Sequence, residues 1–121
     1  MIVEIWRGSL QADAVIRALA ALAQDHRLAA FRLLVQSGAP GIPAGVLAER
    51  LGVPPSSMSF HLAQLANAGL VTQRRESRSI IYSADYAAMN GLMGYLTENC
   101  CGGMPCHDAT ACEPANERKA V

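Results

Sequence analysis

Apolar residues recur at helical spacing along several stretches of this chain. Residues 10–23 and 25–36 each show the i, i+3, i+4, i+7 pattern that predicts an amphipathic helix with one buried face. We expect Asp25 to cap the second of these helices, and Gly38 with Pro40 to end it. The positions expected to face inward are Val15, Ala18, Leu19 and Leu22 in the first helix and Leu28, Phe31, Leu34 and Val35 in the second.

After a loop at residues 37–43, two short helices joined by a sharp turn are predicted between Ala44 and Leu70. Gly52 permits the left-handed backbone that ends the first, and Val53 anchors the turn. Pro54 and Pro55 suit the first turn of the second helix. Ser56 and Ser57 are expected to cap that turn, Met58, Leu62 and Leu65 to form the buried stripe, and Gly69 to end the helix. The short polar residues left outside could reach base edges in a major groove, although amphipathic helix pairs without that function are common.

The pattern then changes to two β-rich runs, residues 70–76 and 79–83, around a polar tip. This alternation predicts a two-stranded hairpin. Three arginines near the tip, Arg74, Arg75 and Arg78, outnumber the single acid Glu76. Because the hairpin follows a helix-turn-helix directly, we interpret it as a wing that touches phosphate or the adjacent minor groove.

A last helix is predicted at residues 86–98, capped by Asp85, with Met89, Leu92, Met93 and Leu96 at helical spacing. Gly91 and Gly94 lie inside it. Since glycine lowers helix stability, these two indicate the close approach of another backbone, such as the same helix of a partner subunit.

Composition narrows the function classes. The chain has 121 residues, 51% of them hydrophobic, which suits one domain. We divide it into a leader at residues 1–9, a domain at 10–99 and a tail at 100–121. The formal net charge of zero excludes a generally basic coat protein, so phosphate contacts must come from the local arginine cluster. No apolar run suits a membrane span or an export signal, and a cytoplasmic protein is expected.

The four cysteines gather at the end of the last predicted helix and beyond it. Cys100 and Cys101 are adjacent, and Gly102 and Gly103 could let Cys106 fold back toward them. Three thiolates suit a soft ion with a trigonal ligand set, such as As(III) or Sb(III). Zinc or cadmium, with Cys112 or His107 as a fourth ligand, and a redox switch through a disulfide remain alternatives. The residues offer no catalytic constellation, so an enzyme is not expected.

Three pieces of the sequence together resemble the ArsR (ArsR/SmtB) family of metal- and metalloid-responsive transcription repressors. They are LAQDHRLAAFRLL at residues 22–34, SSMSFHLAQLANAGLV at residues 56–71, and the cysteines after the last helix. Phe60 stands where many members carry a second His. The chain also lacks the Cys-x-Cys pair of the family's helix-turn-helix and the His ligands of its last helix, which leaves the C-terminal cysteines as the effector site that the resemblance implies.

The resemblance implies a mainly α fold with a small β-hairpin, a winged helix-turn-helix of order α-α-α-α-β-β-α. It further implies a homodimer formed through the first and last helices that binds double-stranded operator DNA and is released by arsenite or antimonite. A thiol redox sensor and a Zn/Cd-responsive repressor are the alternatives. The expected metalloid ligands are Cys100, Cys101 and Cys106. The expected DNA contacts are Ser56, Ser57, Ser59, Phe60, His61, Gln64, Arg74, Arg75 and Arg78.

Overall fold

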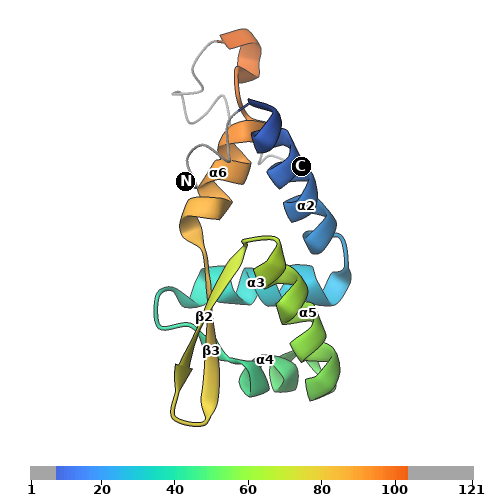
Figure 1. The fold of residues 1–121 in the computed structure, drawn as a ribbon, viewed down its shortest axis with the longest axis vertical. Helices are drawn as coiled ribbons and strands as arrows, with labels where there is room; N and C mark the ends of the chain where they lie inside the picture. The colour runs from blue at the N-terminus through green and yellow to red at the C-terminus, as the bar shows by residue number, and fades with distance from the viewer. Residues whose placement is uncertain (1–7, 104–121) are drawn as a thin grey trace, which may run out of the picture.

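The computed structural model describes residues 8–103 and has an elongated shape (Figure 1). Helices α2 and α6 lie at one end, and the helix-turn-helix with the hairpin tip lies at the other. The predicted winged helix-turn-helix is confirmed. In chain order the elements are α2 (Gly8–Leu22), α3 (Asp25–Ser37), β1 (Ile42–Pro43), α4 (Ala44–Leu51), α5 (Pro55–Asn67), β2 (Val71–Glu76), β3 (Ser79–Ala84), α6 (Tyr86–Leu96) and the 3₁₀ turn η1 (Cys100–Gly103).

The sheet has three strands where the sequence predicted two. In the stretch expected to be a loop, Ile42 and Pro43 form β1, which pairs antiparallel with β3, so the strand order is β1-β3-β2. Gly41 makes this approach possible. Its φ is +76°, and a Cβ there would collide with the carbonyl oxygen of Tyr82 on β3. The missed strand is short, and its proline cannot donate to the ladder, so its sequence carried no strand signal.

One core joins the helices to the sheet. Leu34 of α3, Leu47 of α4 and Leu70 before β2 are fully buried, as is the predicted α5 stripe of Met58, Leu62 and Leu65. Burying a side chain of this size stabilises the fold by about 1.5–3 kcal/mol. Helix α5 is therefore anchored along its whole inner face.

Two predicted caps are wrong and one is confirmed. Gln24, rather than Asp25, caps α3, because its side-chain oxygen accepts from the Arg27 N–H at 3.0 Å. At the start of α5, Pro54 is the cap residue and no side chain bonds the helix end, so Ser56 and Ser57 do not cap it. Asp85 caps α6 as predicted and accepts from the Ala88 N–H at 3.1 Å.

Several apolar residues expected to face inward are exposed. Leu28 on α3 is 45% exposed. The others gather on α2 and α6, where Leu19 is 42% exposed and Met93 and Leu96 are each 55% exposed. Helical spacing identified an apolar face but could not tell a face that packs within the chain from one left on its surface. Of residues 8–103, no helix is both long and apolar enough to cross a membrane.

Candidate nucleic-acid interface

The turn between α4 and α5 sets the direction of the second helix. Gly52 ends α4 in the left-handed region, with φ 64° and ψ 35°, and its N–H points to the Ala48 and Glu49 carbonyls. Val53 is buried and anchors the turn, and Pro55 begins α5 at a position that needs no N–H donor. This local geometry follows directly from the Gly-Val-Pro-Pro sequence.

Helix α5 presents an exposed stripe on the side opposite its buried leucines. Ser56, Ser59, Phe60, Ala63 and Asn67 are exposed, and Ser57, His61 and Gln64 are half-buried along its edges. Phe60, the aromatic residue of this stripe, is 56% exposed. Serine hydroxyls and amides can bond base edges, and an aromatic ring can contact a thymine methyl.

A cluster of side chains joins this helix to α3. Arg27 donates from Nε to His61 Nδ1 at 3.2 Å, and its guanidinium lies 5.5 Å from the centre of the Phe60 ring. The His26 ring stands 5.6 Å from the His61 ring. Desolvation, and then the positive charges of Arg27 and His26, lower the pKa of His61 below its usual 6.5. The lowered pKa favours the neutral imidazole, whose Nδ1 accepts the hydrogen bond from Arg27.

The sequence pattern placed His61 on the second helix of the helix-turn-helix but did not predict its hydrogen bond with Arg27. The two residues are 34 positions apart, and both lie within the segments that carry the family resemblance. The cluster fixes the Phe60 and His61 side chains at the edge of the exposed stripe. Nδ1 of His61 thus already accepts a hydrogen bond from a residue of the same chain.

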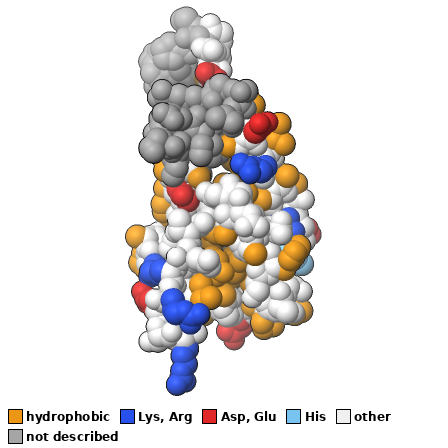
Figure 2. Space-filling view, in the orientation of Figure 1, with side chains coloured by type: hydrophobic (Ala, Val, Ile, Leu, Met, Phe, Trp, Pro, Cys, Tyr) orange, Lys and Arg blue, Asp and Glu red, His pale blue; other side chains and the backbone are white. Residues whose placement is uncertain are grey.

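The wing arginines differ from one another. Arg74 donates to Glu76 Oε2 at 2.7 Å and to the Pro40 carbonyl at 2.8 Å, which ties β2 to the segment before β1. This is the sole ion pair within residues 8–103. Arg75 and Arg78 are exposed near the turn, where Ser77 has a φ of 56°. Figure 2 shows basic side chains gathered over this end of the molecule.

The cysteine cluster lies only partly within the described residues. Helix α6 ends at Leu96, and Cys100 and Cys101 lie exposed in η1, where Cys101 (φ 61°) and Gly102 (φ 69°) adopt left-handed backbone. The last helix therefore ends before these cysteines, two residues earlier than the predicted end at residue 98. Cys106, the third expected ligand, lies outside the described residues, as do His107 and Cys112.

Comparisons with known proteins agree with this geometry. A helix-turn-helix domain family model matches residues 22–74. The chain is 34% identical over 94 residues to the HTH-type transcriptional regulator YgaV of Escherichia coli (strain K12), and the match covers 78% of this chain and 95% of that protein.

Several solved structures share the fold. An ArsR-like transcriptional regulator from Rhodococcus sp. RHA1 is 28% identical, with a TM-score of 0.61, over 71% of this chain and 78% of that one. A homodimeric winged helix-turn-helix DNA-binding domain (fragment 1-100) from Mycobacterium bovis is 26% identical, with a TM-score of 0.59, over 84% of this chain and 96% of that one. The proteins that this chain resembles are transcriptional regulators, not enzymes.

Proposed function

The chain belongs to the ArsR family of winged-helix transcriptional regulators, and we propose that it is an arsenite-responsive repressor of this family. In this proposal a homodimer binds a two-fold-symmetric operator and is released when As(III) or Sb(III) is bound by C-terminal thiolates. The adjacent pair Cys100–Cys101, exposed just beyond α6, carries the proposal.

For DNA, the exposed stripe of α5 enters the major groove, where Ser59, Phe60 and Gln64 meet base edges. Arg75 and Arg78 reach the phosphates or minor groove beside it. In a two-fold dimer the second α5 enters the next major groove on the same side of the duplex, about 34 Å away. Arg74 already bonds Glu76 and Pro40, so its main role is to hold the wing in place.

For the dimer, the exposed apolar side chains of α2 and α6 supply the contact surface. Ile16, 63% exposed, and Leu19 belong to α2, and Met93 and Leu96 belong to α6, the two helices at this end of the molecule (Figure 1). A Cβ added at Gly94 would meet no described atom within 4 Å, so α6 leaves room there for a neighbouring backbone. When two copies bury this surface against each other, apolar area is removed from water. Each Å² of buried apolar area contributes a transfer free energy of about 25 cal/mol.

For the effector, thiolates are soft ligands that favour thiophilic ions. Binding of arsenous acid by Cys100, Cys101 and Cys106 would form three As–S bonds and release three waters, each made from a thiol proton and an arsenic-bound hydroxide. The left-handed backbone at Cys101 ends the helical direction, so the two neighbouring side chains need not point about 100° apart as on a regular helix.

Cys100 and Cys101 lie in η1, at the α2–α6 end of the molecule and far from the wing (Figure 1). Helix α4, the first helix of the helix-turn-helix, contains no cysteine. The signal must therefore pass through α2 and α6 to the spacing of the two recognition helices. An allosteric coupling of about 1–3 kcal/mol would weaken operator binding roughly 5- to 150-fold.

The test is a fluorescence titration of operator duplex, chosen by selection from random sequences, with protein in the presence of arsenite, zinc, cadmium or peroxide. We expect arsenite to release the wild-type dimer, and Cys100→Ser, Cys101→Ser and Cys106→Ser each to bind DNA normally and resist release. Cys112→Ser is the matched control and should respond like wild type.

Release by peroxide alone would support the redox alternative, and release by zinc or cadmium alone would support the divalent-metal alternative. Either result contradicts the metalloid assignment while leaving the DNA-binding assignment intact. Failure of the wild-type protein to bind any duplex at low salt would contradict both.

A further inference from the structure

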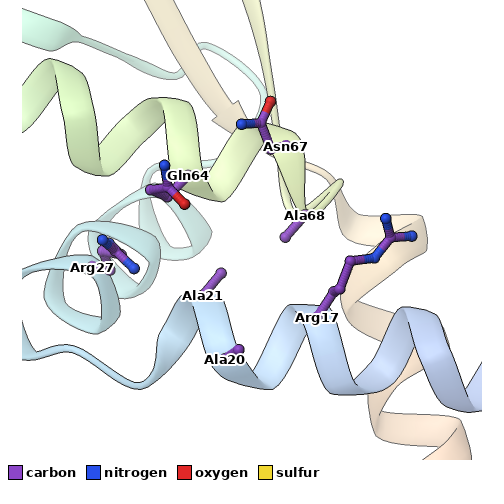
Figure 3. A pocket seen from close by; sticks show the side chains of 7 residues that line it. All are labelled: Arg17, Ala20, Ala21, Arg27, Gln64, Asn67 and Ala68. Carbon is purple, nitrogen blue, oxygen red and sulfur yellow. The ribbon is translucent and has the colours of Figure 1, made fainter.

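A groove of about 340 Å³ runs between α2 and the C-terminal half of α5, beside the exposed stripe (Figure 3). Arg27 from α3 and Gln64 lie toward one end, Arg17 from α2 and Asn67 toward the other, and small alanines line the space between. We call it the Arg17–Arg27 groove. None of the base or phosphate contacts named above involves Arg17 or Asn67.

The lining is chemically suited to an oxyanion. Two guanidinium groups supply positive charge and forked N–H donors, and two side-chain amides supply further donors. Among the described residues that line the groove, none is acidic. Arg27 uses Nε for His61, which leaves its terminal nitrogens for another acceptor. The alanines let an anion approach the helices without a steric barrier.

The position of the groove indicates which oxyanion. A helix in a major groove lies between two phosphate backbones, and this groove follows the flank of α5 beside its exposed face. Asn67 belongs to both the stripe and the groove. The groove is open to solvent rather than closed around a small ion. A strand of DNA passing along α5 could therefore place its backbone there.

We propose that the Arg17–Arg27 groove binds a phosphodiester of the operator backbone, an inference that rests on the DNA-binding function proposed above. Helix α2 then contacts DNA directly while its apolar residues form part of the proposed dimer surface. A shift of α2 in the dimer would move Arg17 relative to the phosphate, which supplies a direct route from the dimer interface to DNA affinity.

The test compares Arg17→Gln with Arg32→Gln in the full-length dimer. Arg32 is an exposed arginine of α3 that lines a different surface, so both variants remove the same charge. Binding to a random-sequence duplex is measured by fluorescence anisotropy over a range of salt concentrations. Each phosphate that a cation neutralises contributes about 0.9 to the log–log salt slope, so the removal of one such cation from each subunit predicts a decrease of about 1.8 for Arg17→Gln and no change for Arg32→Gln.

A second measurement locates the phosphate. Single phosphates of the operator are replaced by neutral methylphosphonates, one position at a time. We expect one position per half-site at which the replacement weakens wild-type and Arg32→Gln binding but not Arg17→Gln binding. A urea unfolding midpoint for Arg17→Gln that equals the midpoint of the wild-type protein verifies that the variant is folded.

The remaining outcomes overturn the inference in distinguishable ways. An unchanged salt slope for Arg17→Gln, while Arg75→Gln lowers it, excludes a DNA phosphate from the groove but leaves the proposed function. Saturable shifts of the Gln64 and Asn67 side-chain amide NMR signals with inorganic phosphate, together with that unchanged slope, would assign the groove to a free anion. Absence of duplex binding by the wild-type protein would contradict the proposed function itself.

Discussion

The contact between Arg27 and His61 predicts a coupling energy that depends on pH. The guanidinium Nε donates to Nδ1 of a half-buried imidazole at 3.2 Å, and a hydrogen bond of this kind contributes about 0.5–1.5 kcal/mol to stability. Protonation of Nδ1 removes the acceptor and sets a cation against Arg27, with His26 close by. We therefore expect a favourable coupling when His61 is neutral and none, or an unfavourable one, when it is charged.

The measurement is a double-mutant cycle of Arg27→Met, His61→Ala and the double variant, each unfolded in urea. At pH 8 the cycle should give a coupling of about 0.5–1.5 kcal/mol. The packing of Arg27 on Phe60 is removed equally in both His61 backgrounds, so it cancels from the cycle. Carboxylates that titrate at low pH cancel for the same reason.

The direction of the pH dependence follows from the lowered pKa of His61. The unfolded chain takes up this proton more readily than the folded one, so the stability associated with neutral His61 is complete above pH 6.5 and is lost as the pH falls through the lower folded-state pKa. The coupling should decline between pH 8 and pH 4.5. A coupling within about 0.3 kcal/mol of zero at pH 8, or one that is the same at both pH values, would refute this reasoning.

Three further predictions concern the sheet, the dimer and base recognition. Gly41→Ala should lower the free energy of unfolding by about 2–5 kcal/mol and Gly52→Ala by only about 1–2 kcal/mol. Both glycines have a positive φ, but only at Gly41 would the added methyl group collide with β3. Equal decreases for the two variants in urea unfolding would contradict this account. Met93→Glu should shift sedimentation equilibrium toward monomer, whereas Leu28→Glu, an exposed apolar residue on α3, should not; dissociation by both would place the interface elsewhere. Ser59→Ala should change the bases selected from random duplexes while leaving the salt slope unaltered, since Ser59 is exposed on α5 and carries no charge; a changed slope with unchanged bases would reverse its role.

The sequence by itself determined the elements with strong local signals. The Gly-Val-Pro-Pro segment specifies the turn before α5, because Gly52 accepts left-handed backbone and the prolines suit a helix start. The spacing of Met58, Leu62 and Leu65 identified the buried face of α5. Asp85 identified the start of α6 through its side-chain cap. Each of these depends on residues within about one or two turns of one another.

Tertiary structure alone decided whatever depends on distant neighbours. Strand β1 exists because β3 lies beside Gly41, and two residues ending in proline carry no strand pattern of their own. Helical spacing could not show that Met93 and Leu96 lie on the surface, since an apolar face has the same pattern whether it packs within the chain or is left exposed.

The same limit applied to the candidate site on and around α5. Its exposed stripe and the wing arginines were predicted from local pattern, whereas the Arg27–His61 contact and the Arg17–Arg27 groove were not. These two features join α2, α3 and α5. Arg27 and His61 are 34 positions apart, so no local sequence pattern predicts their contact. Residues near in sequence fixed which helix presents its side chains outward, and packing between distant helices decided which of those side chains are held in place and which cations lie beside them.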